Sequence, residues 1–357
     1  MVYLLRSSVA MRNSVKNLKR PSYRTVPDDI LRMHDNSNLF MANPAARRVA
    51  ERFDFDSLSK YPPVAADELR EAIGNKWKVS PDQVLVGNGS DELIDLVVKT
   101  FCDRGDRAAI PIPTFEMYSM YLTIAGAKIV TCRLKRGFQL DVDGILSARP
   151  KMTFIASPNN PTGNSMQKED ILRIIEDSKA LVVVDEAYCE FASGTKFTGL
   201  VDEYDNLIVL RTFSKAYALP GLRIGFAIAS KKIADAMRRV EPPFRLNRFS
   251  EQVAIEALKD DDFIEKTVKM ANTERAWLSG ELERLGAKIY PSETNFITFR
   301  APIPVKELVF GLLRRKIAIR DCSSQPMLRN CARVTFGRRD INSRFISAMT
   351  EVLEEAR

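Results

Sequence analysis

The chain has 357 residues, of which 45% are hydrophobic and 28% are charged. This length exceeds what one hydrophobic core usually organises, and the composition is that of a globular protein, so we expect two domains. The formal net charge is +8, but residues 1–24 hold six basic residues and no acid, which leaves +2 for the remainder. We therefore expect that residues 25–357 do not form a nucleic-acid-binding domain. No apolar run approaches the roughly 20 residues that span a bilayer, so we expect no membrane partner.

The cysteines and the histidine exclude several kinds of site. The five cysteines are odd in number and form no C-x-x-C pair, so we expect neither a disulfide framework nor a metal site. Free cysteines also fit a reducing cytoplasm. The only histidine is His34, so a Ser-His-Asp triad would have to be built around this one residue and is not favoured. We expect a lysine to carry out any proton transfer.

The first regular elements follow an irregular start. In the basic segment 1–24 we expect an amphipathic helix docked on the protein, and residues 33–44 form an Asn-rich loop that ends in proline. Residues 84–101 predict a strand, a glycine turn and a helix beginning near Ser90. Glu92 replaces the third glycine of the dinucleotide fingerprint, so an NAD site is disfavoured. The free N–H groups of Ser90 and Asp91 at a helix N-terminus still suit a phosphate.

Apolar runs alternate with helical or turn-rich sequence across the middle of the chain. These runs are residues 108–115, 128–134, 152–157, 181–188 and 207–214. The alternation predicts a mostly parallel sheet that is covered by helices on both faces. In such sheets, sites form at the carboxyl ends of the strands, and each motif below follows a strand.

The sequence RTFSKAYALPGLRIGF, residues 211–226, places Lys215 between two predicted buried strands. Burial disfavours the charged amine, which suits a nucleophile that forms a Schiff base near neutral pH. The hydroxyls of Thr212 and Ser214 and the guanidinium of Arg223 then resemble a phosphate cradle. An imine-forming amine beside a phosphate site indicates pyridoxal phosphate. Alone, the motif would favour an exposed lysine in a Ser/Thr-rich loop, and two further motifs reverse this preference.

Two further motifs supply what such a cofactor requires. In VVVDEAY, Asp185 ends a strand and can pair with the ring nitrogen, although an aspartate there is also a common helix N-cap. Asn160 of SPNNPTG and Tyr188 can donate to the phenolate oxygen, although Asn160 also suits a plain turn. Phe115 can cover the ring, although a single aromatic residue is more often part of the core. Together, in one order along a predicted parallel sheet, these residues are a specific signal for a pyridoxal-phosphate site.

From Pro242 onward the sequence changes character. We expect a helix from Asp262 to about Leu285, then short strands and helices, which make a smaller α+β domain. The predicted division is an N-terminal arm (1–45), a large domain (46–249) and a small C-terminal domain (250–357).

The motifs PNNPTG, VVVDEAY and TFSKAYALPGLRIGF resemble those of the fold-type-I pyridoxal-phosphate aminotransferases, which share the aspartate aminotransferase fold. The segments YPPVAADELREAI, VLVGNGSDELI, PTFEMYS and AIRDCSSQPMLRNCARVTFG are similar to the subgroup that acts on histidinol phosphate. The similarity covers about residues 23–357. It implies a cytoplasmic homodimer with active sites at the subunit interface, where the arm also packs. It also implies transfer from L-histidinol phosphate to 2-oxoglutarate, which gives imidazole-acetol phosphate and glutamate.

The resemblance also implies a role for individual residues. Lys215 would bond to the cofactor and shuttle a proton, and Lys215, Asp185 and Tyr188 are the catalytic set. The cofactor-binding set is Ser90, Asp91, Phe115, Asn160, Asp185, Tyr188, Thr212, Ser214, Lys215, Arg223 and, from the neighbouring chain, Tyr61. The anionic ends of the amino donor and the 2-oxo acid would meet the substrate-binding set, which is Tyr23, Asn36, Arg320 and Arg333.

One loop departs from the family pattern. The N-E-N-P sequence of the family is replaced here by Asn36-Ser37-Asn38-Leu39, which leaves the substrate open. The alternatives are an aminotransferase for aromatic or other amino acids, a decarboxylase of phosphorylated amino acids, and a non-catalytic regulatory protein that binds pyridoxal phosphate.

Overall fold

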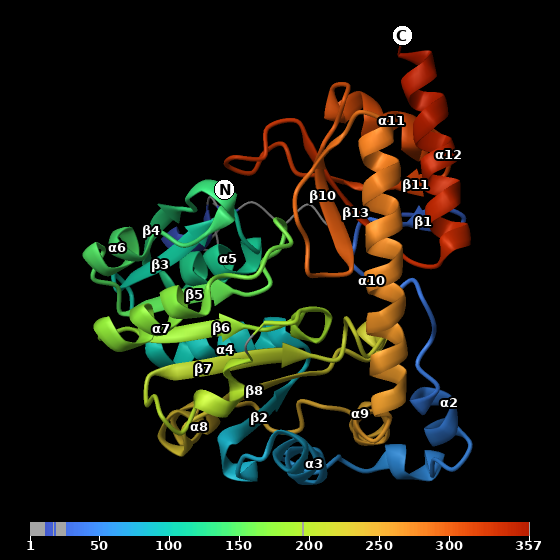
Figure 1. Ribbon diagram of the computed structural model, residues 1–357. Coiled ribbons are helices and arrows are strands. Elements are labelled where there is room, and N and C mark those ends of the chain that lie inside the picture. The colour runs from blue at the N-terminus through green and yellow to red at the C-terminus, as the bar shows by residue number, and fades with distance from the viewer. Residues whose placement is uncertain (1–10, 17, 19–25, 195, 357) are drawn as a thin grey trace, which may run out of the picture.

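The computed structural model describes residues 11–16, 18, 26–194 and 196–356, and Figure 1 shows two lobes beside each other. The larger lobe is built on a seven-stranded sheet. In spatial order, its strands are β2 (Val84–Gly87), β8 (Gly225–Ala229), β7 (Leu207–Thr212), β6 (Leu181–Asp185), β5 (Met152–Ala156), β3 (Arg107–Ile112) and β4 (Lys128–Arg133). All neighbours pair in parallel except β8, which runs antiparallel to both β7 and β2. The predicted mostly parallel sheet is confirmed.

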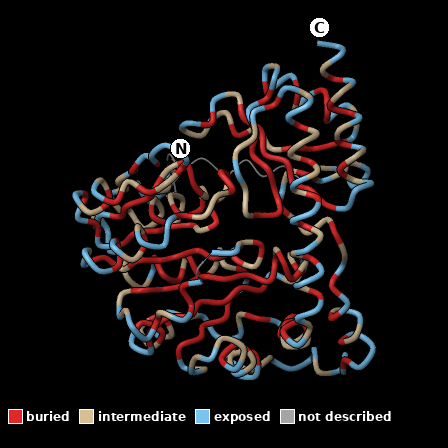
Figure 2. The backbone as a smooth tube through the Cα atoms, in the orientation of Figure 1, coloured by how far each residue is buried: buried red, intermediate tan, exposed pale blue. Residues whose placement is uncertain are grey.

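Helices cover both faces of this sheet because its strands are apolar on both sides. Val182 and Val184 of β6 belong to one core cluster and Val183 to another, as alternation along a strand requires. Figure 2 shows the middle strands of this sheet as buried, while most residues of the edge strand β4 are intermediate or exposed. The helices of this lobe are α1 (Asn13–Lys16), α2 (Ala45–Ala50), α3 (Asp67–Trp77), α4 (Ser90–Phe101), α5 (Glu116–Ala125), α6 (Val142–Ser147), α7 (Lys168–Asp177), α8 (Lys231–Arg238) and α9 (Arg248–Leu258). Its 3₁₀ helices are η1 (Phe55–Ser59), η2 (Pro81–Gln83), η3 (Arg136–Phe138), η4 (Cys189–Phe191), η5 (Phe197–Leu200) and η6 (Pro220–Leu222).

The smaller lobe packs helices against an antiparallel sheet in the order β12-β13-β10-β9. Its elements are α10 (Asp261–Arg284), β9 (Lys288–Ile289), β10 (Phe296–Arg300), α11 (Val305–Arg314), β11 (Ile317–Ala318), β12 (Arg320–Asp321), β13 (Cys331–Thr335) and α12 (Arg339–Glu355). In Figure 1, α10 runs upright past both lobes. Its ends lie within one residue of those predicted. Among the described residues, no helix is long and apolar enough to cross a membrane.

The predicted N-terminal arm contacts both lobes where it is described. Ser14 Oγ, in α1, donates to Ile124 O of the large lobe at 3.1 Å. Further on, β1 (Leu31–Arg32) pairs in parallel with β11 of the small lobe. Most of the amphipathic helix expected in residues 1–24 lies outside the described residues.

Two hydrophobic cores bear on where the domains divide. Val253 and Ala257 of α9 belong to a core of the large lobe, whereas Leu278 and Leu282 of α10 belong to the core of the small lobe. The predicted division between residues 249 and 250 falls inside α9. We propose that the division follows α9, because the buried side chains of this helix then stay with the core of the large lobe.

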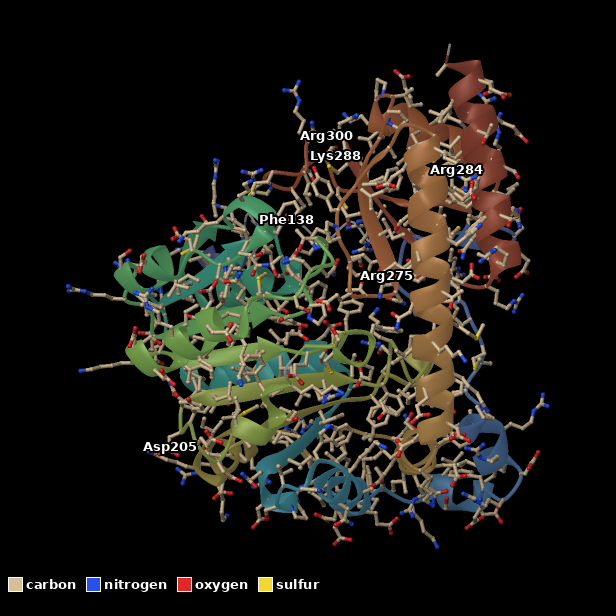
Figure 3. All side chains as sticks on the ribbon, in the orientation of Figure 1. Phe138, Asp205, Arg275, Arg284, Lys288 and Arg300 are labelled. Carbon is tan, nitrogen blue, oxygen red and sulfur yellow. The ribbon has the colours of Figure 1, made fainter. Side chains whose placement is uncertain are left out.

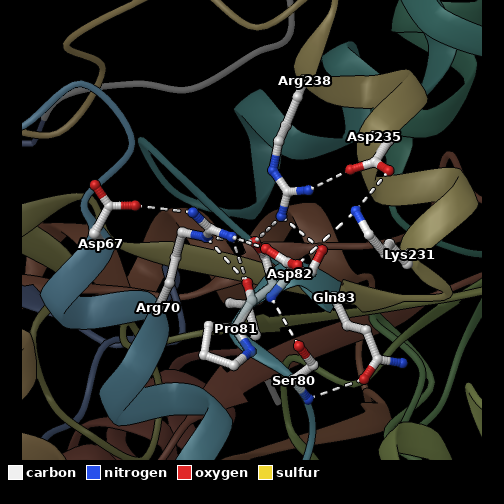
Figure 4. A network of polar contacts seen from close by, with 10 residues as sticks. Asp67, Arg70, Ser80, Pro81, Asp82, Gln83, Lys231, Asp235 and Arg238 are labelled. Atoms are coloured by element: carbon white, nitrogen blue, oxygen red, sulfur yellow. Dashed lines mark hydrogen bonds and ion pairs between the residues drawn. The ribbon is translucent and has the colours of Figure 1, made fainter.

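A polar network fixes the short helix η2 that leads into β2 (Figure 4). Arg70 donates to Pro81 O at 2.6 Å and Arg238 donates to Asp82 O at 2.6 Å, so two helices hold one turn. Charge-assisted bonds of this kind are stronger than neutral ones. The network therefore sets where β2 begins, and with it the glycine turn at its other end.

The packing of α10 generates a stability prediction. Leu278 is fully buried in the core of the small lobe, so Leu278→Ala should lower the free energy of unfolding by about 2–5 kcal/mol through lost burial and a residual cavity. Denaturant unfolding followed by circular dichroism measures the change. The control is Thr273→Ala, an exposed position on the same helix, which should stay within about 0.5 kcal/mol. Equal effects at both positions would contradict the assignment of the buried face.

Candidate active site

One cavity lies at the carboxyl ends of β5, β6 and β7, beside the start of α4 and α5. It is lined by Ser90, Asp91, Phe115, Tyr118, Ala156, Pro158, Asn160, Asp185, Ala187, Tyr188, Thr212, Ser214, Lys215 and Arg223. With Tyr61 as the single exception, every residue of the predicted cofactor set therefore lines this cavity. Parallel strands bring these distant segments together because their carboxyl ends share one edge of the sheet.

Lys215 follows β7 and reaches toward the N-terminal arm. Its Nζ donates to Asn36 O at 3.2 Å and lies 3.5 Å from Asp35 O. The amine also lies 5.6 Å from the centroid of the Tyr188 ring. Burial, with the nearby positive charges of Arg333 and Arg223, lowers the pKa of Lys215 to about 8, although nearby acids oppose this shift. A substantial share of the amine is therefore neutral near physiological pH, as a nucleophile requires.

Asp185 ends β6 with a carboxylate that is 5% exposed. Tyr118 Oη donates to its Oδ2 at 2.6 Å, and the Ala187 N–H donates to its Oδ1 at 3.0 Å. Burial raises the pKa of Asp185 to about 6, although both hydrogen bonds favour the charged form. The carboxylate is thus fixed in direction and would be stabilised by a cation.

Tyr118 is a site residue that the sequence analysis missed. It lies three residues after Phe115 in α5, and the two rings meet edge to face with centroids 5.6 Å apart. Helical spacing could have suggested this, because residues i and i+3 share a face. Its bond to Asp185 could not have been inferred, because it joins residues 67 positions apart.

At the other end of the cavity, several hydrogen-bond donors lie close together. Arg223 Nη1 lies 3.5 Å from Ser214 Oγ, and its Nη2 lies 3.5 Å from Asp91 Oδ2 at the start of α4. A Cβ added to Gly225 would lie 2.4 Å from the Ser90 nitrogen, so only glycine allows β8 to pass this close. A guanidinium, two hydroxyls and a helix N-terminus form a donor set that fits a phosphate group.

The substrate side is made by β12, β13 and the loop before residue 37. Arg333 is 8% exposed and its Nη2 donates to His34 O at 2.6 Å, while its Nη1 donates to Asn160 Oδ1. Arg320 is paired with Arg333 across β12 and β13, and its Nη2 lies 3.5 Å from Glu116 Oε1. The two predicted substrate arginines are therefore neighbours.

Asn36 joins this side of the cavity to the catalytic set. Its Nδ2 donates to Tyr188 Oη at 2.8 Å, and its backbone oxygen accepts from Lys215. Asn36 has a positive φ of 59°, a conformation that asparagine tolerates better than most residues. The loop that departs from the family pattern thus still contacts two predicted catalytic residues.

Two predicted residues are not brought into the cavity of this chain. Tyr61 is 78% exposed and stacks on Phe244, with ring centroids 4.6 Å apart. Its predicted role was in the site of a neighbouring chain. Tyr23 lies outside the described residues. Among the residues that are described, no cluster of His, Cys, Asp and Glu could hold a metal ion.

Comparison with known proteins gives the family. Residues 28–348 match the family described as aminotransferase class I and II. The chain belongs to this family. It is 36% identical to histidinol-phosphate aminotransferase of Thermoanaerobacter sp. (strain X514), covering 96% of this chain and 98% of that protein. It is 37% identical to the histidinol-phosphate aminotransferase of Methanocaldococcus jannaschii, covering 93% and 91% of the two chains.

A solved structure agrees with these relatives. The crystal structure of the histidinol-phosphate aminotransferase from Clostridium acetobutylicum matches with a TM-score of 0.85 and 27% identity, over 91% of this chain and all of that chain. The fold class, the family and the assignment as an aminotransferase are thereby confirmed. The roles predicted for individual residues stay predictions.

The buried carboxylate generates a prediction that requires no cofactor. The pKa of Asp185 is raised in the folded protein, so the wild type loses stability as pH rises from about 4 to about 6. Asp185→Asn removes this titration, and its stability relative to the wild type should grow by about 3 kcal/mol over that window. Denaturant unfolding of cofactor-free protein between pH 4 and pH 7 measures the difference.

The control for this experiment is Asp205→Asn. Asp205 is exposed and precedes β7 at the opposite end from Thr212, and Figure 3 labels it at the edge of the large lobe. Its free energy of unfolding should stay within about 0.5 kcal/mol of the wild type throughout. A constant difference between Asp185→Asn and the wild type across the pH range would contradict the raised pKa of Asp185.

Proposed function

We propose that this aminotransferase uses pyridoxal phosphate to transfer the amino group of L-histidinol phosphate to 2-oxoglutarate, forming imidazole-acetol phosphate and glutamate. The observation that carries the proposal is the convergence of Lys215, Asp185 and Arg223 on one cavity beside Arg333. The names of the relatives support the choice of donor. Histidine biosynthesis in the cytoplasm is the setting in which such a reaction belongs.

The residues of the cavity fit the chemical groups of the cofactor one by one. Bound pyridoxal phosphate supplies an aldehyde that joins to amines and a ring that withdraws electrons from the substrate Cα. Asp185 would pair with the ring nitrogen and keep it protonated, since a buried carboxylate with a raised pKa gains from a cationic partner. Tyr188 Oη now accepts from Asn36, so its own proton is available for the phenolate oxygen, beside Asn160.

Lys215 would hold the cofactor and then act as the acid and base. Its partly neutral Nζ would accept the proton of the substrate Cα and, once protonated, would donate it again within the same site. Phe115 would cover the ring. The phosphate of the cofactor would be held by the N–H groups of Ser90 and Asp91, the hydroxyls of Thr212 and Ser214, and Arg223.

The two arginines on β12 and β13 explain how one site can serve both halves of the reaction. Histidinol phosphate has no α-carboxylate, so Arg320 and Arg333 would face its phosphate, whereas for glutamate they would face carboxylates. The planar guanidinium binds either anion through two hydrogen bonds, which lysine cannot reproduce. Asn36, and Tyr23 from the part of the chain that is not described, would complete this side.

The altered loop Asn36-Ser37-Asn38-Leu39 supports a second candidate. Leu39 has an apolar side chain where the family pattern has proline. Nearby, Arg333 Cζ lies 5.2 Å from the centroid of the Phe296 ring. An aromatic amino acid would find an arginine for its carboxylate here. We therefore keep an aromatic aminotransferase as the alternative function.

We further propose that the active form is a homodimer. Tyr61 and Phe244 lie in a group of exposed apolar side chains that also includes Phe55, Leu58 and Val64. Five exposed apolar side chains, four of them within residues 55–64, support a protein interface. A second copy packed on this surface would bring Tyr61 toward the phosphate end of its partner's cavity.

The role of Lys215 gives the first test. The purified protein with added pyridoxal phosphate should absorb in the visible region, and Lys215→Ala should lose that band when no amine is added. Lys306→Ala, an exposed position on α11, should keep it. A wild type that stays colourless with added cofactor would overturn the proposed function.

Histidinol phosphate should discharge the band faster than phenylalanine at equal concentration, and the reverse order would favour the alternative function.

The shared site gives the second test. Lys215→Ala and Tyr61→Ala chains should each be inactive as pure dimers. Mixed dimers should recover part of the activity, because one of their two sites holds both wild-type residues. Activity is measured after heterodimers are isolated with two affinity tags. No recovery in verified heterodimers would show that Tyr61 does not act across the interface.

A further inference from the structure

The only histidine of the chain, His34, lies beside the two arginines of the substrate side. Its backbone oxygen accepts from Arg333 Nη2 at 2.6 Å, and both Arg320 and Arg333 act electrostatically on its imidazole. Its Nδ1 is buried and has no hydrogen-bond partner among the described residues. Arg333 Nε is likewise buried without one in the described part of the chain.

Two buried polar atoms without partners are costly unless a ligand satisfies them. A polar group that loses water and gains no hydrogen bond destabilises the fold, so native proteins keep few such groups. Within the described residues, Nδ1 of the imidazole makes no hydrogen bond that would give it a structural role. A ligand bound between the imidazole and the arginines would supply the missing partner for both orphaned nitrogens.

We propose that His34 is a specificity-determining residue that donates a hydrogen bond to the phosphate group of the amino donor, together with Arg320 and Arg333. The proposal rests on the proposed function and names what selects the donor. A phosphate monoester offers three terminal oxygens and about two negative charges at neutral pH, and a carboxylate offers two oxygens and one charge. A third donor at this position therefore favours a phosphorylated amine over an amino acid.

The charges around His34 add a pH dependence to this contact. Burial is the main cause that lowers the pKa of His34, and Arg333, Arg320 and Arg32 of β1 lower it further, while Asp35 on the same loop opposes them. Without an anion the imidazole is therefore neutral at pH 7. A bound phosphate dianion offsets the arginines and raises the pKa, so a proton is taken up with the ligand. Affinity for phosphate should then fall as pH rises through the pKa of the complex.

A single histidine allows a direct measurement. Tag-free holoenzyme labelled with ¹⁵N-histidine gives the ring nitrogens of His34 alone, and inorganic phosphate is the probe. Adding phosphate should shift both ring signals and raise the pKa of His34 by about one unit or more, as expected for a charge brought within contact distance. Acetate, with one charge, should give a smaller shift. A pKa unchanged at saturating phosphate would overturn the proposal.

Substitutions test specificity. His34→Leu should lower kcat/KM for histidinol phosphate about tenfold or more, as expected for a lost charge-assisted hydrogen bond, with little change for glutamate. His34→Asn should recover part of the loss, because its amide nitrogen occupies the place of Nδ1. The control Arg32→Gln removes a nearby exposed charge that pairs with Asp28, and should stay within about twofold. An equal loss in the control would reduce the effect to general electrostatics and overturn the proposal.

The outcomes separate this proposal from the proposed function. If histidinol phosphate is a donor while phosphate leaves the His34 signals unmoved, the role of His34 is wrong and the proposed function stands. If phosphate shifts the signals while histidinol phosphate is no donor, the anion contact stands and the donor is wrong. Should the variants fail to fold, the measurement on wild-type protein decides.

Discussion

Three successive backbone carbonyls join the two lobes at the cavity. The oxygen of His34 accepts from Arg333 of the small lobe, while those of Asp35 and Asn36 face the amine of Lys215 in the large lobe. This loop belongs to neither sheet, yet it fixes the distance between the predicted nucleophile and the predicted substrate arginine. The loop is itself anchored on the small lobe by β1 and by the Asn36 N–H, which donates to Thr335 Oγ1.

The positions of Asp185 and Thr212 depend in turn on the opposite face of the same strands. Asp185 is adjacent in sequence to Glu186, and Thr212 is adjacent to Arg211. Because side chains alternate along a strand, these two buried charges point away from the cavity. Arg211 bonds to Glu190 at 2.6 Å and lies 3.4 Å from Glu186. A buried ion pair is a poor source of net stability, but removal of one partner leaves an unpaired charge. The pair therefore holds the ends of β6 and β7 in one arrangement.

Chemistry and stability are opposed in this cavity. The lowered pKa of Lys215 and the raised pKa of Asp185 share a first cause, removal of the charged form from water. That same burial makes the amine nucleophilic and leaves the carboxylate in need of a cation. The large apolar cores on both faces of the sheet offset this cost. The aminotransferase thus keeps these two groups at the ends of strands that are almost completely buried.

The sequence by itself determined the alternation of strands and helices, the family, and the polar residues of the cavity other than Tyr118, because strand periodicity and the three motifs are local properties of the chain. Tertiary structure alone decided the contact of Tyr118 with Asp185, the antiparallel direction of β8, and the bond between the carbonyl of His34 and Arg333. Those contacts join residues 67 and 299 positions apart, or depend on which way a strand returns. Sequence patterns carry no record of such pairings, since backbone oxygens look alike at every position and a strand reads the same in both directions.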